Sequence, residues 1–161
     1  MLSLSQTTGY AIRALTCLRF GESAALVMAK DIAEATGIPL PYLSKLMHAL
    51  GQAGLITTKR GYRGGFALAR PAEAISLMDI TEAIEGPNDN ASCLLGLETC
   101  SDERACPLHR FWKQERQRIE KAMCQMTLRE VAKFEAHLMK ATGVTESQSK
   151  GEQAKTKSKS K

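Results

Sequence analysis

The sequence predicts a mostly α-helical protein with one small β-hairpin. Apolar residues recur at helical spacing along most of the chain. Short helices are predicted over residues 29–36 and 39–51, and Gly37 between them suits a tight turn because glycine adopts positive φ without steric cost. Residues 55–58 and 66–68 are strand-like runs on either side of a glycine-rich, basic tip. Helix, turn, helix and basic hairpin, in that order, are typical of a winged helix-turn-helix.

The helices of this unit are indicated by their apolar patterns. A first amphipathic helix is predicted over residues 3–20 and ends at Gly21. The helix over residues 39–51 begins at Pro39, because proline is favoured in the first turn of a helix. The predicted buried face of that helix consists of Leu43, Leu46, Met47 and Leu50.

The second half of the chain is predicted to hold a cysteine loop and two further helices. A capping box over residues 76–79 opens a short helix that ends near Gly86. A long helix begins at Pro107, and a second capping box over residues 127–130 begins the last helix. The predicted organisation is a winged helix-turn-helix domain over residues 1–86, the cysteine loop over 87–106, a long helix with a C-terminal helix over 107–144, and a disordered basic tail over 145–161.

Composition restricts the class of protein. The chain has 161 residues, of which 43% are apolar, and this is enough for one ordinary core. No apolar run approaches the ~20 residues that a membrane span needs. The N-terminal residues lack the basic start and apolar stretch of a signal peptide. Five cysteines, an odd number, disfavour a secreted disulfide framework. We therefore expect a cytoplasmic protein with no membrane partner.

Positive charge is concentrated in the predicted winged domain. Residues 1–70 hold eight Lys and Arg against three Asp and Glu, whereas residues 71–144 hold nine against twelve. A basic surface on this fold favours double-stranded DNA as the partner, and a solvated surface without a ligand is the alternative. The second helix of the motif lies in the major groove, and an arginine-bearing wing suits the minor groove. The candidate DNA-binding residues are Tyr42, Ser44 and Lys45 on the helix, Arg60 and Arg63 in the wing, and Arg13 and Lys59 on phosphates.

Three cysteines and a histidine follow within one short stretch, at Cys93, Cys100, Cys106 and His109. Thiolates select zinc, copper(I) or iron–sulfur clusters. Structural zinc sites usually contain close cysteine pairs, which this stretch lacks. Wide spacing on a loop suits an iron–sulfur cluster, which takes four protein ligands, mostly cysteines. His109 lies three residues after Cys106, so both can face one centre; a hydrogen bond at the helix start is the alternative role for His109.

The remaining cysteines and histidines give no second site. Cys17 and Cys124 lie among apolar helix positions and are predicted to be small core residues. None of the three histidines has a nucleophile at a catalytic spacing, so no enzymatic activity is predicted. Further oxygen donors near the cysteines are Glu98, Asp102 and Glu103.

Several motifs together match a known family over residues 1 to about 140. They are the run Tyr10–Leu15, Ile38-Pro39-x-x-Tyr42-Leu43, Gly54-Leu55-Ile56, Arg60-Gly61-x-x-Gly64-Gly65-Phe66 and the cysteine loop. In these motifs the chain resembles the Rrf2 family of bacterial regulators, which includes iron–sulfur sensors. The resemblance implies a homodimeric transcription regulator in which the helix over about 107–126 is the dimerisation helix, and repression is the expected mode of regulation. It also implies that a cluster sensing iron, redox state or nitric oxide alters the affinity for operator DNA.

The resemblance also bears on the type of cluster. The spacing Cys106-x-x-His109 resembles an arrangement in which the histidine is a ligand of a two-iron cluster, so 2Fe–2S is favoured over 4Fe–4S. Another branch of the family takes an aspartate from the partner's first helix, but the run Thr7-Thr8-Gly9 offers no carboxylate here. The first cysteine gap is one residue longer than in iron–sulfur members. The alternatives are a winged-helix regulator with structural zinc, or one with a thiol–disulfide switch and no cluster.

Overall fold

The structure is a computed structural model that describes residues 4–18, 25–61, 64–87, 93–95 and 100–142. Within them, six α-helices accompany a two-stranded antiparallel hairpin, which confirms the predicted fold class. No helix of this part of the chain is long and apolar enough to cross a membrane. The elements are α1 (Gln6–Thr16), α2 (Ala29–Thr36), α3 (Leu40–Gln52), β1 (Ile56–Lys59), β2 (Gly65–Leu68), η1 (Ala72–Ala74), α4 (Leu77–Glu85), η2 (Asp102–Arg104), α5 (His109–Gln125) and α6 (Leu128–Thr142), where η marks a 3₁₀-helix.

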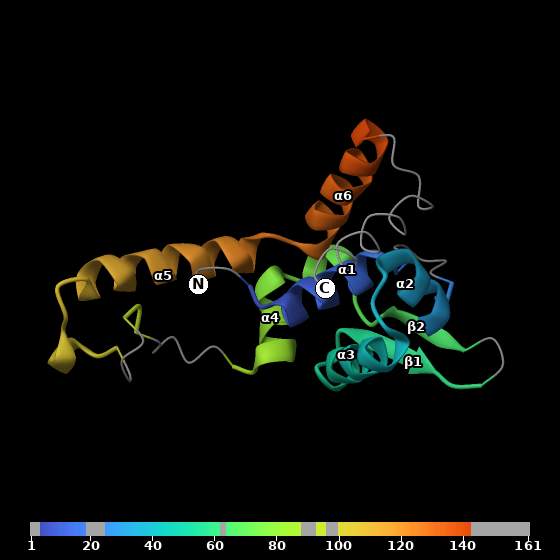
Figure 1. Cartoon of the computed structure of the whole chain (residues 1–161), viewed down its shortest axis with the longest axis horizontal. Helices are drawn as coiled ribbons and strands as arrows, with labels where there is room; N and C mark the ends of the chain where they lie inside the picture. Colours follow the sequence, from blue (N-terminus) through green and yellow to red (C-terminus); the bar gives the residue numbers. More distant parts are fainter. Residues whose placement is uncertain (1–3, 19–24, 62–63, 88–92, 96–99, 143–161) are drawn as a thin grey trace, which may run out of the picture.

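Helices α1 to α4 and the hairpin form a body from which α5 extends as a long arm (Figure 1). The core of this body is formed by side chains from several elements. Leu128, in the first turn of α6, is also fully buried in this core, so α6 is anchored to the body at its N-terminal end. The fully buried large side chains of the body include Leu15 of α1, Ile32 of α2, Leu43 and Leu50 of α3, and Ile80 of α4.

Helix boundaries differ from the predicted ones where capping residues intervene. The first helix begins at Gln6, because Ser5 is the N-cap and its hydroxyl accepts a hydrogen bond from the Thr8 amide at 3.1 Å. It ends at Thr16, and the predicted stop at Gly21 lies outside the described residues. Helix α3 begins at Leu40, with Pro39 as its N-cap residue. Helix α5 begins two residues later than predicted, after a turn that the cysteine loop forms.

The turn between α2 and α3 is the glycine turn that the sequence predicted. Gly37 has φ 71° and ψ 10°, a left-handed conformation, and its amide donates to the Ala33 carbonyl at 2.9 Å. This arrangement ends α2 and redirects the chain, and only glycine adopts it without a steric penalty. The turn therefore sets the angle at which α3 leaves α2.

The wing contains one pairing that the sequence did not indicate. Strands β1 and β2 pair antiparallel with Ile56 opposite Leu68. Val27, just before α2, forms a further bridge to Phe66, with hydrogen bonds of 3.0 and 2.9 Å between their backbones. Gly65 permits this contact, because a Cβ there would lie 2.6 Å from the Val27 carbonyl oxygen. The hairpin is thus tied to the segment that precedes the helix-turn-helix.

The junction between α5 and α6 is fixed to the start of α4. The Leu77 amide donates to the Met126 carbonyl at 2.9 Å, and the Leu128 amide donates to the Ile75 carbonyl at 2.8 Å. Both predicted capping boxes are present on either side of this bridge, one over residues 76–79 and the other over residues 127–130. The C-terminal end of α5 therefore has a defined connection to the winged body.

Candidate DNA-binding surface and cysteine–histidine site

Helix α3 presents one buried face and one exposed face. The predicted apolar stripe is buried, with Leu43 and Leu50 fully so. Ser44, Lys45 and His48 are exposed, and the Ser44 hydroxyl donates to the Leu40 carbonyl at 2.9 Å. The exposed face is therefore polar and basic, as a helix that enters the major groove requires.

Two of the predicted DNA-binding residues are engaged within the protein. The Tyr42 hydroxyl lies 2.8 Å from the Thr7 hydroxyl, and the Tyr42 ring packs edge-on against Tyr10 at 5.9 Å between centroids. The Arg13 guanidinium donates from Nη2 to the Thr36 carbonyl at 2.8 Å. Both contacts join α1 to the helix-turn-helix. The Tyr42 contacts hold α3 against α1, and the Arg13 contact holds α2 against α1.

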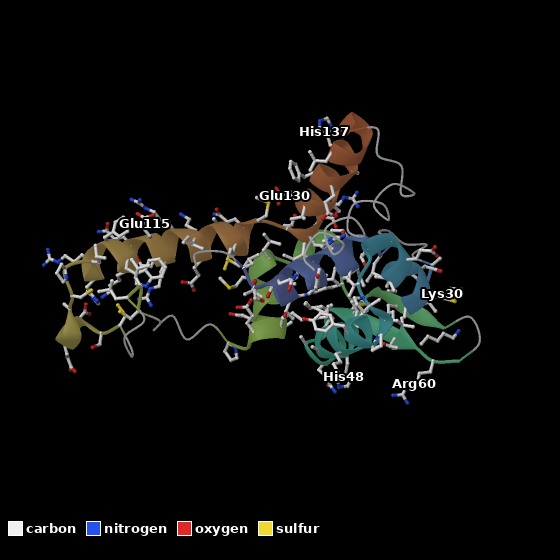
Figure 2. The ribbon with its side chains drawn as sticks, in the orientation of Figure 1. Lys30, His48, Arg60, Glu115, Glu130 and His137 are labelled. Atoms are coloured by element: carbon white, nitrogen blue, oxygen red, sulfur yellow. The ribbon has the colours of Figure 1, made fainter. Side chains whose placement is uncertain are left out.

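The wing carries exposed basic residues next to a narrow turn. Lys59 and Arg60 are exposed, and Figure 2 shows Arg60 at the outer edge of the body on the side of His48. Gly61 has φ 94°, and a Cβ on Gly64 would lie 2.2 Å from the Lys59 carbonyl oxygen, so the tip needs glycine at both positions. Arg63 lies outside the described residues.

Residues 100–106 of the cysteine loop lie at the opposite end of the molecule, where α5 begins (Figure 1). The structure brings Cys100 and His109 together: Cys100 Sγ lies 3.2 Å from His109 Nδ1. His109 is only 5% exposed, although it begins the helix, because the loop folds over it. Its backbone amide also donates to the Cys106 carbonyl at 2.9 Å. A soft thiol and an imidazole nitrogen therefore share one small volume.

Asp102 and Lys113 complete this site. Asp102 Oδ1 lies 2.8 Å from His109 Nε2, and Lys113 Nζ lies 3.1 and 3.0 Å from the two carboxylate oxygens of Asp102. Hydrogen bonds from Lys113 and His109 lower the pKa of Asp102 below its ordinary value of 3.8, so Asp102 is a carboxylate at neutral pH. Sequence reasoning named Asp102 only as a spare oxygen donor and did not find Lys113, although its position one helical turn after His109 is visible in the sequence.

The other cysteines are placed differently. Cys93, Cys100 and Cys106 are half-buried, and the described part of the chain contains no group of three or more Cys, His, Asp or Glu side chains that could hold a metal ion. Cys17 is half-buried and packs against the core, in keeping with its predicted place. Cys124 is exposed, so the prediction that it is a core residue was wrong. Most of α5 is exposed to solvent in the single chain, so no packed core surrounds Cys124.

The fold and the exposed basic face define a winged-helix DNA-binding protein. The chain belongs to the Rrf2 family, described as iron-dependent transcriptional regulators, whose model matches residues 4–133. The protein is therefore a transcriptional regulator and not an enzyme. Its relatives include the HTH-type transcriptional regulator IscR of Yersinia pseudotuberculosis, which is 30% identical over 130 residues that cover 81% of this chain and 79% of the relative.

Solved structures give the same fold. CymR, the global cysteine regulator of B. subtilis, superposes with a TM-score of 0.68 at 28% identity and covers 83% of this chain and 98% of its own. IscR of T. potens superposes with a TM-score of 0.63 at 30% identity, and covers 82% of this chain and 87% of its own. CymR and IscR, two regulators with different names, therefore share one fold with this chain.

Proposed function

We propose that the protein is a homodimeric repressor whose affinity for operator DNA is set by an iron–sulfur cluster. Cys93, Cys100, Cys106 and His109 would hold the cluster, with 2Fe–2S favoured over 4Fe–4S. The approach of Cys100 Sγ to His109 Nδ1 at 3.2 Å is the observation that carries this proposal. It joins a thiol and an imidazole, which are the ligand types that a histidine-containing cluster site requires.

The donor chemistry of the loop fits such a cluster. Three half-buried thiols would supply the soft ligands that iron–sulfur clusters take, and one buried imidazole would supply a nitrogen ligand that also suits iron. When bound, the cluster supplies chemistry that the protein lacks by itself, because its iron responds to electrons, oxygen and nitric oxide.

The chain's own residues provide the DNA contacts. In the proposed complex, Ser44 and Lys45 reach base edges or phosphates from the exposed face of α3. Lys59 contacts the backbone, and Arg60 and Arg63 enter the minor groove. Arg13 holds α2 against α1 through its hydrogen bond to Thr36, and Tyr42 holds α3 against α1 through its contact with Thr7.

A second copy of this chain is the proposed partner of α5. Leu108, Phe111, Ile119 and Met126 are between 40% and 56% exposed and repeat on one face of the helix. Such an apolar stripe is costly in water and is typical of a protein interface. Because residues 100–106 of the cysteine loop lie at the end of α5 that points away from its own winged body, dimerisation through α5 offers a route by which the loop influences DNA binding.

A thiol–disulfide switch is the second candidate function. Its support is that the structural neighbour CymR of Staphylococcus aureus is known in an oxidized form, while the described residues gather two of the four proposed ligands and not three. In this case Cys93, Cys100 and Cys106 would respond by forming disulfides. A structural zinc ion with constitutive repression is the third arrangement that the same donors allow.

The first experiment is purification without oxygen, followed by a visible spectrum and counts of iron, sulfide and zinc per chain. We expect a brown protein with iron and sulfide in equal amounts. Binding to duplexes selected from a random-sequence pool is then measured with the cluster present and after its removal by a chelator. A change in affinity of at least tenfold on roughly palindromic sites supports the sensor. A colourless protein that takes up no iron and sulfide contradicts it and favours the thiol or zinc arrangement.

A further inference from the structure

We infer that Asp102 is a positioning residue that fixes which nitrogen of His109 faces the metal centre. This inference rests on the proposed function and names a part of the site outside the four ligands. A continuous chain of side-chain contacts lies at the beginning of α5. Cys100 Sγ, the His109 ring, the Asp102 carboxylate and the Lys113 ammonium follow one another at distances between 2.8 and 3.2 Å.

The direction of the hydrogen bonds follows from the chemistry of the groups. An ionised carboxylate only accepts hydrogen bonds, so the 2.8 Å contact requires His109 Nε2 to carry the hydrogen that it donates to Asp102 Oδ1. In the neutral ring, Nδ1 then holds the free lone pair. Nδ1 is also the nitrogen that faces Cys100 Sγ. Asp102 therefore holds the ring in the tautomer and orientation that a metal on the cysteine side needs.

Lys113 keeps Asp102 in place. It lies four residues after His109, on the same face of α5, and its ammonium contacts both carboxylate oxygens. The side chain of Asp102 is 77% exposed, whereas that of His109 is 6% exposed, so the carboxylate would swing into solvent without this anchor. With its oxygens directed at His109 and Lys113, Asp102 is suited to orienting a ligand and not to being one.

A carboxylate behind a ligating histidine also makes the imidazole a stronger donor. Loss of such an outer partner typically weakens metal binding by about 10- to 100-fold. The neighbouring carboxylate Glu103, on the same 3₁₀-helix, provides a matched control because it is exposed and has no place in the chain of contacts to His109.

The test uses the full chain reconstituted with ferrous iron and sulfide without oxygen. Two quantities are measured: the rate at which visible absorbance is lost after a chelator is added, and the nitrogen coupling of the reduced cluster by pulsed electron paramagnetic resonance. We expect Asp102→Ala to lose its cluster about 10- to 100-fold faster and to show an altered nitrogen coupling. Asp102→Asn, whose amide oxygen still accepts from Nε2, should be intermediate. Glu103→Ala should match the wild type.

Each result has a defined meaning. Asp102→Ala with wild-type cluster loss and nitrogen coupling overturns the inference. A wild-type cluster with no nitrogen coupling also overturns it, while leaving the iron–sulfur proposal standing on the cysteines. A wild type that takes up no iron and sulfide overturns both together. If Asp102→Ala does not fold by circular dichroism, Lys113→Ala replaces it, and we expect a smaller change in the same direction.

Discussion

Arg13 of α1 and Thr36 of α2 are joined by a hydrogen bond of 2.8 Å from the guanidinium Nη2 to the backbone carbonyl. Thr36 is the last residue of α2, and Gly37 follows it in the turn to the recognition helix. A charged donor at the end of a helix binds a carbonyl that has no partner within the helix. Arg13 thus links α1 to the end of α2, just before the Gly37 turn that orients α3.

This contact predicts that Arg13→Ala weakens DNA binding by disordering the turn. We expect a loss of about 1 kcal/mol in the free energy of unfolding, measured in urea, and weaker binding at all salt concentrations. The slope of log affinity against log salt should stay unchanged. A slope that falls by about 0.9 for each lost contact would show instead that Arg13 binds phosphate directly.

The left-handed turn at Gly37 predicts opposite effects for two glycine substitutions. Gly37→Ala should destabilise the protein by about 1 kcal/mol, because a Cβ at φ 71° meets its own backbone although the surroundings are open. Gly51→Ala, inside α3, should stabilise it by about 0.5 kcal/mol, since a Cβ there would make an ordinary contact of 3.9 Å with Ile56. Thermal unfolding followed by circular dichroism measures both. Equal effects would contradict the assigned role of Gly37.

Local chemistry explains which elements of the fold were predictable. Gly37, the two capping boxes and the apolar face of α3 act over four or five residues, so their signals lie within short stretches of sequence. The bridge from Val27 to Phe66 depends on residues 39 positions apart, and only a folded backbone shows it. The start of α1 was predicted too early because Leu4 continues the apolar spacing, whereas Ser5 is the N-cap and the helix begins after it, at Gln6.

The sequence placed Cys100 and His109 in one candidate site, and the structure brings these two side chains together, but their further contacts were not predictable. The spacing of the cysteines and His109 indicated a metal centre without indicating that Asp102 would bind the far side of the ring. A pattern also cannot show that a side chain is already engaged, as Tyr42 is with Thr7. The prediction for Cys124 was wrong because its apolar neighbours line an arm that the single chain leaves exposed.

The wing predicts that DNA binding can be separated from cluster binding. Arg60→Ala combined with Arg63→Ala should abolish tight binding to selected duplexes, because an arginine pair in a minor groove contributes much of the electrostatic attraction. The visible spectrum and the iron content should stay unchanged, since Arg60 lies on the winged body and residues 100–106 of the cysteine loop lie beside the N-terminal end of α5, away from that body. Fluorescence anisotropy with a labelled duplex measures the affinity. Tight binding by the double variant would show that the wing is not a contact surface.

Glu85 predicts a stability difference that depends on pH. The hydrogen bond from the fully buried Thr8 lowers the pKa of Glu85 below its ordinary value of 4.5. A depressed pKa stabilises the folded protein above about pH 4.5, and the stabilisation is lost as the pH falls through the lower folded value. Glu85→Gln should therefore be less stable than the wild type at pH 7, by well under 1 kcal/mol because Glu85 is exposed and water screens it.

Urea unfolding at neutral and acid pH tests this expectation. The difference between Glu85→Gln and the wild type should shrink toward zero in acid. Glu82→Gln makes the same change of charge on the same helix and serves as the control. A difference for Glu85→Gln that stays constant across the pH range would mean that the Thr8 contact does not depend on the charge of Glu85.

The apolar stripe of α5 predicts that one charge converts the proposed dimer into a monomer. Ile119 is 45% exposed in the single chain and lies at the centre of the stripe. In Ile119→Glu, a two-fold interface would bury two unpaired carboxylates, each at a cost of about 3 kcal/mol or more, so the dissociation constant should rise more than a hundredfold. Gln117→Glu adds the same charge on the opposite, exposed face and should leave the dimer intact. Sedimentation velocity over a range of concentrations distinguishes the two variants. If Ile119→Glu remains a dimer, the two chains associate through another surface, and the exposed face of α6, with Phe134 at 62% exposed, is the next to examine in the same way.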